Sequence, residues 1–231
     1  MAGKYDWYQA ATWEEDSASV FEERIARARR MRPQYMEVQG RTLLRAESRR
    51  DREAGRSLLR RVISDYADAP EDYYEARHAV VVSWGQLGAS HHADGQVAEA
   101  LAAFAALRTL APTVPHIHTL GYEIRCLDVL IDLGDRDSLD EAFIEVERLR
   151  VAQLRDSFQF PKDTFALALR AARLYQRLGG ARAASEASTA LGILTNLDDP
   201  VRRHHVLGEI ETSAQELGEL DAIIDSFRSA T

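Results

Sequence analysis

Apolar residues recur at spacings of three and four along nearly the whole chain, and no stretch alternates convincingly between apolar and polar positions. Helix-breaking residues interrupt this pattern at intervals: Pro33, Pro70, Gly95, Pro112 with Pro115, Gly134, Pro161, Gly179-Gly180, Pro200 and Gly218. This punctuation predicts many medium-length helices joined by short turns, and no strands.

The breakers divide the chain into helical segments of similar length. A first helix is expected over about residues 13–31, and a last helix over about 200–217 with a short tail after it. Between them the pattern predicts four helical hairpins, at about 34–67, 71–111, 116–155 and 162–197. We therefore expect one domain, residues 1–231, in which 1–33 and 198–231 cap the hairpins of 34–197.

Three of the expected helix starts carry capping residues, which satisfy free backbone N–H groups in the first turn. They are Thr12 with Glu15, Ser138 with Glu141, and Asp199 before Pro200. The proline of the third signal is well placed, because its missing N–H costs nothing at the first helical position.

The segment 84–112 carries the most specific pattern. It opens with the spacing W-x2-L-G, turns at Gly95 and closes with a proline. Small residues at Gly88 and Ala100 would let its two helices approach closely. Larger side chains would fill the space between this hairpin and its neighbours: Trp84, Leu87 and Phe104.

Weaker copies of this pattern follow. The second-helix alanines Ala100, Ala142 and Ala184 repeat every 42 residues. That period exceeds the roughly 34 residues of a tetratricopeptide repeat and falls in the range of HEAT or armadillo units. The hairpin expected at 34–67 has apolar residues at helical spacing but no tryptophan or glycine landmark.

The 84–112 pattern resembles the tetratricopeptide repeat. Over nearly its whole length the chain is also similar to a group of bacterial tetratricopeptide proteins, most clearly at residues 13–21, 34–39, 58–66, 160–161 and 202–204. This resemblance implies an all-α fold, a right-handed α-solenoid of about four tetratricopeptide-like hairpins with N- and C-terminal capping helices. It also implies a bacterial origin, and it implies no activity.

Composition and charge narrow the class of protein. Hydrophobic residues make up 45% and charged residues 29%, as in soluble globular proteins. No apolar run is long enough for a membrane span, the N-terminal residues lack the apolar stretch of a signal peptide, and Cys126 is the one cysteine. We therefore expect a cytoplasmic protein without membrane contact.

The net charge of −8 argues against general nucleic-acid binding. The charge is unevenly spread, because residues 24–61 carry a net +9 and the rest of the chain −17. The interpretation that we favour is a set of solvated helix faces rich in arginine.

Residues with reactive side chains form no recognisable catalytic pattern. The histidine pairs His91-His92 and His204-His205 lack the further ligands of a zinc site. Cys126 lies in an apolar helical stretch, where burial would make its thiol inert. The pair Gly179-Gly180 lacks the Lys-Ser/Thr of a phosphate-binding loop and is typical of a helix stop. We expect no catalytic residue, no metal and no cofactor, and therefore no enzyme.

A binding groove is the remaining candidate site. In resembling arrays the first helix of each hairpin lines a concave groove, which here predicts these partner-binding residues: Arg41, Glu47, His92, Asp128, Arg170, Arg173, Gln176 and Arg177, with Glu37 and Gln86 beside them. The last three arginines share one helix face, where they could hold an acidic peptide by charge-assisted hydrogen bonds.

Some tetratricopeptide co-chaperones grip a partner's C-terminal carboxylate with Lys and Asn on this face. The matching positions here are Gly85 and Ala89, so that function is not implied and the inner face of this hairpin is expected to be nearly bare.

An apolar stripe in the third hairpin would also face the groove: Ile124, Leu127 and Ile131. Such a stripe is either a hydrophobic ligand groove or a surface covered by another segment. We favour coverage by one of the chain ends, because the end units of a stack need capping. The candidates are the aromatic N-terminal segment with Tyr5, Trp7, Tyr8 and Trp13, and the C-terminal tail.

The leading functional hypothesis is a cytoplasmic, non-enzymatic scaffold that binds a protein or peptide partner, preferably an acidic one. Two alternatives stay open. One is an immunity or regulatory protein that neutralises a cognate effector, and the other is a nucleic-acid binder that uses the arginine-rich region 24–61.

Overall fold

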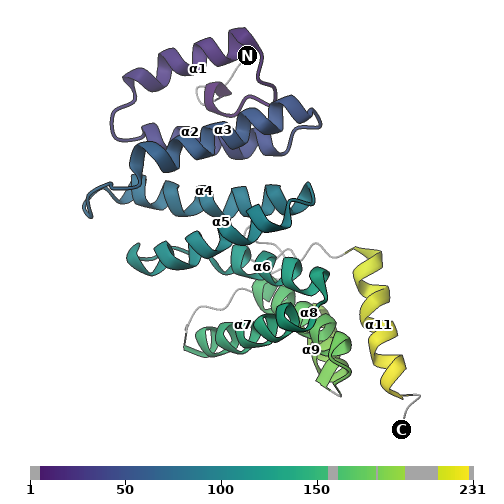
Figure 1. Ribbon diagram of the computed structural model, residues 1–231. Helices are drawn as coiled ribbons and strands as arrows, with labels where there is room; N and C mark the ends of the chain where they lie inside the picture. The colour runs from purple at the N-terminus through teal and green to yellow at the C-terminus, as the bar shows by residue number, and fades with distance from the viewer. Residues whose placement is uncertain (1–5, 156–160, 181, 196–212, 229–231) are drawn as a thin grey trace. The chain divides into compact units, whose positions relative to one another are not determined.

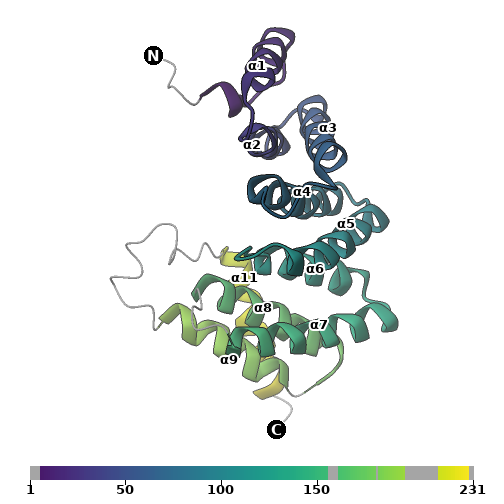
Figure 2. The same cartoon turned by 90° about the vertical axis from the view of Figure 1, so that its left-hand side faces the viewer.

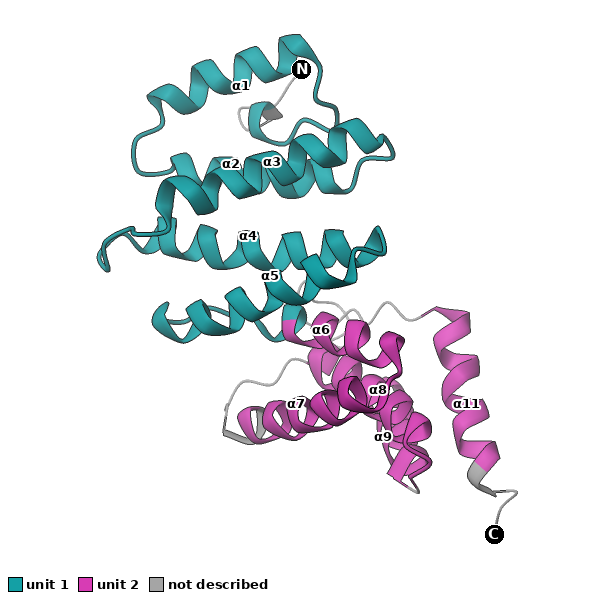
Figure 3. Cartoon of the chain, in the orientation of Figure 1, with its two compact units in different colours: residues 1–122 teal, residues 123–231 magenta. Residues whose placement is uncertain are grey.

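The computed structural model describes residues 6–155, 161–180, 182–195 and 213–228. Every regular element in these ranges is a helix, which confirms the expected all-α class (Figure 1). The chain divides into two compact units, residues 1–122 and 123–231 (Figure 3).

Unit 1 is built from helices that pair with their neighbours in sequence. Its elements are η1 (Asp6–Tyr8), α1 (Glu15–Arg27), α2 (Arg32–Leu44), α3 (Arg49–Tyr66), α4 (Tyr74–Ala93), α5 (Val97–Leu110), η2 (Ala111–Thr113) and the first turn of α6 (Leu120–Leu133). Helix α2 packs on α3 and α4 on α5, and both α2 and α3 contact α4 (Figures 1 and 2). The helices lie within a few residues of the expected segments.

The aromatic N-terminal residues pack inside unit 1. Trp7 contacts the rings of Tyr35 and Phe21, at centroid distances of 5.0 and 5.8 Å. Trp13 packs edge-on against Phe21, which is fully buried together with Ile25. The described part of this segment therefore covers α1 and α2, and Tyr5 lies outside the described residues.

A pair of glycines lets α2 and α3 approach closely. A Cβ atom on Gly55 would lie 2.7 Å from the carbonyl oxygen of Gly40, and one on Gly40 would lie 2.9 Å from the side chain of Leu59. Both distances are shorter than van der Waals contact. This hairpin thus has a glycine landmark on each helix, contrary to the sequence interpretation, because neither glycine is preceded by the tryptophan and leucine of the W-x2-L-G pattern.

The packing predicted for the 84–112 segment is confirmed. A Cβ on Gly88 would lie 2.8 Å from the ring of Phe104, and Phe104 and Ala100 are fully buried. Leu87 packs with Leu59 and Ala103, and Trp84 lies against the same cluster.

The expectation that the face around Gly85 is bare is wrong. The ring of Tyr122 lies directly on this glycine, 2.5 Å from where a Cβ would stand. The side-chain amide of Gln86 donates a hydrogen bond of 2.9 Å to the hydroxyl of Tyr122. Glycine is needed here so that an aromatic ring from α6 can reach the backbone of α4.

Unit 2 contains the rest of α6 together with α7 (Arg136–Arg155), α8 (Pro161–Arg177), α9 (Arg182–Thr195) and α11 (Ala214–Arg228). Helix α8 packs on α9 and on α7, and α11 lies against α9 and α8 (Figure 1). The hydroxyl of Tyr175 donates a 2.8 Å hydrogen bond to Glu147, which ties α8 to α7. The buried face of α8 is apolar, and Leu169 and Leu174 on it are fully buried.

Two expected helix starts are displaced, because a carboxylate residue takes the cap position and a serine stands three residues later. Glu14 caps α1 instead of Thr12, and its N–H donates to Ser17 Oγ over 2.9 Å. Helix α7 begins at Arg136, so Asp135 precedes it and accepts from the N–H and the hydroxyl of Ser138. These hydrogen bonds hold the pKa of Asp135 below its usual value.

The alanine that is buried at the start of α9 is not the one that the 42-residue repeat predicts. Ala142 is fully buried as predicted, but in α9 it is Ala183 that is fully buried, and Ala184 is partly exposed. The strict period of 42 residues therefore does not extend to α9.

The C-terminal end also differs from the sequence map. Helix α11 runs through Gly218, where a helix stop was expected, and includes the residues assigned to a tail. Ser213 and Glu216 form its capping box: the Glu216 N–H donates to Ser213 Oγ over 3.1 Å, and the Ser213 N–H donates to Glu216 Oε2 over 2.9 Å. The expected start at Asp199-Pro200 lies outside the described residues, as does most of the helix expected at 200–217.

Candidate functional site

The arginine row of α8 is held at its first position by an internal ion pair. Arg170 donates to both carboxylate oxygens of Asp128 on α6, from Nε at 2.9 Å and from an Nη at 3.0 Å. Both side chains are about four-fifths buried, with 17% and 21% of their surfaces exposed. This bidentate geometry is the strong form of an arginine–carboxylate pair. Arg170 and Asp128 therefore join α8 to α6 and compensate each other's charge.

The second arginine of the row is paired with α11. Arg173 donates to Oε2 of Glu219 from two nitrogens, at 2.6 and 3.0 Å. Its guanidinium also lies 4.0 Å from Asp128. This pair is more exposed than the first, since 28% of the Arg173 side chain and 37% of the Glu219 side chain are accessible.

The third arginine, Arg177, is exposed and has no ion-pair or hydrogen-bond partner in the part of the chain that the structure describes. It lies with Gln176 and Arg173 in a pocket of about 470 Å³ within unit 2. The other walls come from α6 and α11: Ile131, Asp132, Gln215, Glu219, Ala222 and Ile223. Three of the predicted partner-binding residues thus meet in one pocket, with α11 as its outer wall.

Glu216 on α11 adds a second carboxylate near the arginines. Burial raises its pKa, but hydrogen bonds from Ser213 and the positive charges of Arg170 and Arg173 outweigh that effect, so the pKa lies below its usual value. The carboxylate is therefore ionised at neutral pH and stabilised by the arginine row.

The other predicted residues lie in unit 1. Arg41 Nε is 3.5 Å from Oε1 of Glu37, on the same helix. Glu37 is only 5% exposed, and burial raises its pKa against the opposing effect of Arg41. Glu47 is exposed in the turn between α2 and α3, so its placement on a helix face is wrong. His92 is half-buried in the last turn of α4.

Seven of the thirteen arginines in segment 24–61 form ion pairs with acidic residues. Arg56, nearly buried, donates to the side chain of Asp94 and to Ser90 Oγ at 2.9 Å. Arg61 and Arg30 pair with acids outside the segment, Glu22 and Glu75, at 2.6 and 3.1 Å. Further pairs fix the arginines at 27, 41, 52 and 60. Four of these arginines, at 30, 52, 56 and 61, link different elements, and those at 27, 41 and 60 pair within their own helix.

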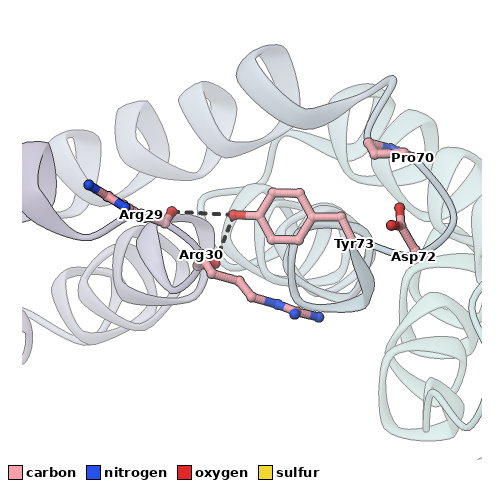
Figure 4. Close-up of a pocket in the computed structure, with 5 residues that line it drawn as sticks. All are labelled: Arg29, Arg30, Pro70, Asp72 and Tyr73. Atoms are coloured by element: carbon pink, nitrogen blue, oxygen red, sulfur yellow. Dashed lines mark hydrogen bonds between the residues drawn. The ribbon is translucent and has the colours of Figure 1, made fainter.

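A second pocket, of about 430 Å³, lies where the turn after α1 meets the loop before α4 (Figure 4). The hydroxyl of Tyr73 donates to the backbone oxygen of Arg30 at 2.7 Å and lies 3.5 Å from that of Arg29. The two guanidinium groups point away from this hydroxyl (Figure 4), and that of Arg30 pairs with Glu75. The polar groups around this pocket therefore join the two turns to each other.

The apolar stripe of α6 is covered. Ile124, Leu127 and Ile131 are 3%, 0% and 4% exposed. On the C-terminal side, Ile131 shares the pocket wall with Ile223 of α11, which is 1% exposed. Cys126 is buried in the same helix, as expected.

Within the described ranges, no helix is both long and apolar enough to cross a membrane. In the same residues, no three His, Cys, Asp or Glu side chains gather as ligands of a metal ion would; His204 and His205 lie outside them. Comparison of the chain with known protein families, curated proteins and solved structures finds no significant match.

Proposed function

We propose that the chain is a non-enzymatic, cytoplasmic binding protein whose tetratricopeptide-like hairpins form a right-handed solenoid, and that it holds an acidic partner at the pocket of α8. The observation that carries the proposal is Arg177. This guanidinium is exposed and makes no hydrogen bond or ion pair with the described residues, and it stands beside Gln176 and Arg173 in a pocket of about 470 Å³.

The pocket suits a carboxylate chemically. Arg177 supplies a planar guanidinium that can donate two parallel hydrogen bonds, and the amide of Gln176 can donate another. The neighbouring apolar surface of Ile131 and Ala222 would contact the aliphatic part of a Glu or Asp side chain. An acidic segment of a partner protein therefore matches the pocket better than an isolated anion.

The arginine-rich alternative receives less support. A nucleic-acid surface needs cations that are available to phosphates. Seven of the thirteen arginines in segment 24–61 already pair with acidic side chains, those at 27, 30, 41, 52, 56, 60 and 61. The immunity-type alternative uses the same acidic-partner chemistry and differs in the identity of the partner.

The test is the binding of a fluorescein-labelled hexaglutamate peptide to the full chain, measured by fluorescence anisotropy. Arg177→Gln should weaken binding by about two- to fivefold, the value of one partly exposed charge pair. Arg125→Gln is the matched control, because Arg125 is an exposed arginine of α6 outside the pocket. Equal binding by the Arg177 variant and the wild type would show that the pocket is not the site.

Arg170 and Arg173 are poorer first targets. Removing the Arg170 guanidinium leaves the largely buried Asp128 with only the 4.0 Å contact of Arg173, and removing that of Arg173 breaks the ion pair between α8 and α11. Either change alters unit 2 for reasons unrelated to a ligand. Arg177 avoids this complication.

A further inference from the structure

One stripe of α11 combines acidic and apolar residues that face α8 and α9. Glu216, Glu219, Leu220 and Ile223 stand at positions i, i+3, i+4 and i+7, which is one face of a helix. Leu220 and Ile223 are buried, and Glu219 binds Arg173 through two hydrogen bonds. Helix α11 is thus an acidic amphipathic helix seated on a cationic surface of the same chain.

The ion pairs of the arginines on α8 differ in how readily another molecule could replace them. The Arg170–Asp128 pair is the better shielded one and links α8 to α6. The Arg173–Glu219 pair is open to solvent over more than a quarter of each side chain, so a second carboxylate can reach Arg173 from the pocket. Arg177 and Gln176, in the same pocket, make no hydrogen bond through their side chains to the side chains of α11 that the structure describes, residues 214–226.

We propose that α11 is a resident ligand of the α8 surface, and that the partner is itself an acidic amphipathic helix that competes with α11 for Arg173. This inference rests on the proposed function, and it adds the form of the partner and its regulation. The partner helix carries two carboxylates three residues apart and apolar residues on the same stripe, as α11 does. It gains over α11 by also engaging Arg177.

The test uses a fluorescein-labelled synthetic peptide with the sequence of residues 213–228, which is α11 with its capping serine. Binding of this peptide to the full chain is measured by fluorescence anisotropy for the wild type and for Glu219→Gln. The substitution weakens the resident helix and leaves the peptide unchanged. The Glu219→Gln chain should therefore bind the peptide about two- to fivefold more tightly than the wild type.

Asp221→Asn is the matched control. It removes the same charge from an exposed position of the same helix, outside the pocket. This variant should bind the peptide as the wild type does. A gain of equal size in the Asp221 variant would overturn the inference, because the effect would then come from net charge alone.

Hydrogen exchange provides an independent readout. Saturating peptide should accelerate amide exchange in residues 214–228 of the full chain. The fluorescein label changes the mass of the peptide, so fragments of the peptide and of the chain can be distinguished by mass. Unchanged exchange, or equal peptide affinity of the wild type and Glu219→Gln, would overturn the competition model.

The two proposals fail in different ways. If hexaglutamate binds in an Arg177-dependent manner while Glu219→Gln has no effect on the peptide, the proposed function stands and α11 is only a cap. If neither hexaglutamate nor the peptide binds any variant, both proposals are wrong.

Discussion

The close approach of α2 and α3 at Gly40 and Gly55 makes a quantitative prediction for Gly55→Ala. The new Cβ would stand 2.7 Å from the Gly40 carbonyl oxygen, 3.0 Å from Leu43 Cβ and 3.1 Å from the Leu44 nitrogen. Two of these three atoms belong to the backbone, so no side-chain rotation relieves the clash. The helices must separate instead, which loosens the packing around them.

The magnitude follows from two opposing effects. Overpacking of this kind costs about 1–3 kcal/mol, and a substitution that moves backbone belongs at the upper end of that range. Against this cost, alanine stabilises the helix by about 1 kcal/mol relative to glycine, because of its better helix propensity. We therefore expect Gly55→Ala to lower the free energy of unfolding by about 1–2 kcal/mol, which corresponds to a fall in Tm of roughly 2–8 °C for a chain of this size.

Tryptophan fluorescence is the appropriate assay, because all three tryptophans lie in unit 1, at positions 7, 13 and 84. A fluorescence melt therefore follows unit 1, and circular dichroism follows both units. Gly121→Ala is the control, since no atom lies within 4 Å of its added Cβ, and it should leave Tm unchanged or slightly raised. If Gly55→Ala melts at or above the wild-type temperature, the close crossing of α2 and α3 is refuted.

Three further predictions concern unit 1. Gly85→Ala drives a methyl into the Tyr122 ring and should destabilise the unit; a Tyr122→Ala background should abolish most of this loss, with a coupling of about 1–2 kcal/mol in a double-mutant cycle. The raised pKa of Glu37 means that the folded state keeps its proton to higher pH than the unfolded state, so stability falls as pH rises from about 4.5 through the folded pKa. Urea unfolding at pH 5 and pH 7 measures this decline in the free energy of unfolding, and Glu37→Gln should make the decline smaller. A decline as large as in the wild type would exclude Glu37 as its source. The hydrogen bond from Arg56 and the charges of nearby arginines lower the pKa of Asp94, against the opposing effect of burial. The ionised Asp94 carboxylate therefore adds to the free energy of unfolding above about pH 4, and this addition is lost as pH falls through the lowered pKa. Asp94→Asn should lower Tm at pH 7 and reduce the fall in Tm below about pH 4. A variant whose Tm falls with acid as steeply as that of the wild type would contradict this assignment.

The candidate site was predicted in part. The spacing of Arg170, Arg173 and Arg177 placed them on one helix face, and the structure brings the last two into one pocket with Gln176. What the spacing did not indicate is that Arg170 and Arg173 are already paired, with acids 42 and 46 residues away. Glu47 and His92 were assigned through the resemblance and belong to unit 1, whereas the residues that line this pocket belong to unit 2.

Local information sufficed for the secondary structure. The 3.6-residue periodicity and its breakers place the described helices before α11 within a few residues, because a helix buries one stripe and ends where proline or glycine disrupts its hydrogen bonds. Helix α11 is the exception, since it runs through Gly218. The contact of Gly88 with Phe104 was also predictable, since it lies within one hairpin with a known spacing. Helix caps were less certain, because carboxylate and hydroxyl residues near α1 and α7 compete for the same N–H groups.

Beyond the predicted hairpin pairs, tertiary structure alone decided which side chains the packed helices bring together. The glycine pair Gly40 and Gly55, the ring of Tyr122 on Gly85, and the seat of α11 on α8 all depend on the distance and rotation between packed helices. Sequence spacing specifies which residues share a face of one helix. It leaves open which partner that face acquires, because the partner is chosen by the packing of the unit as a whole.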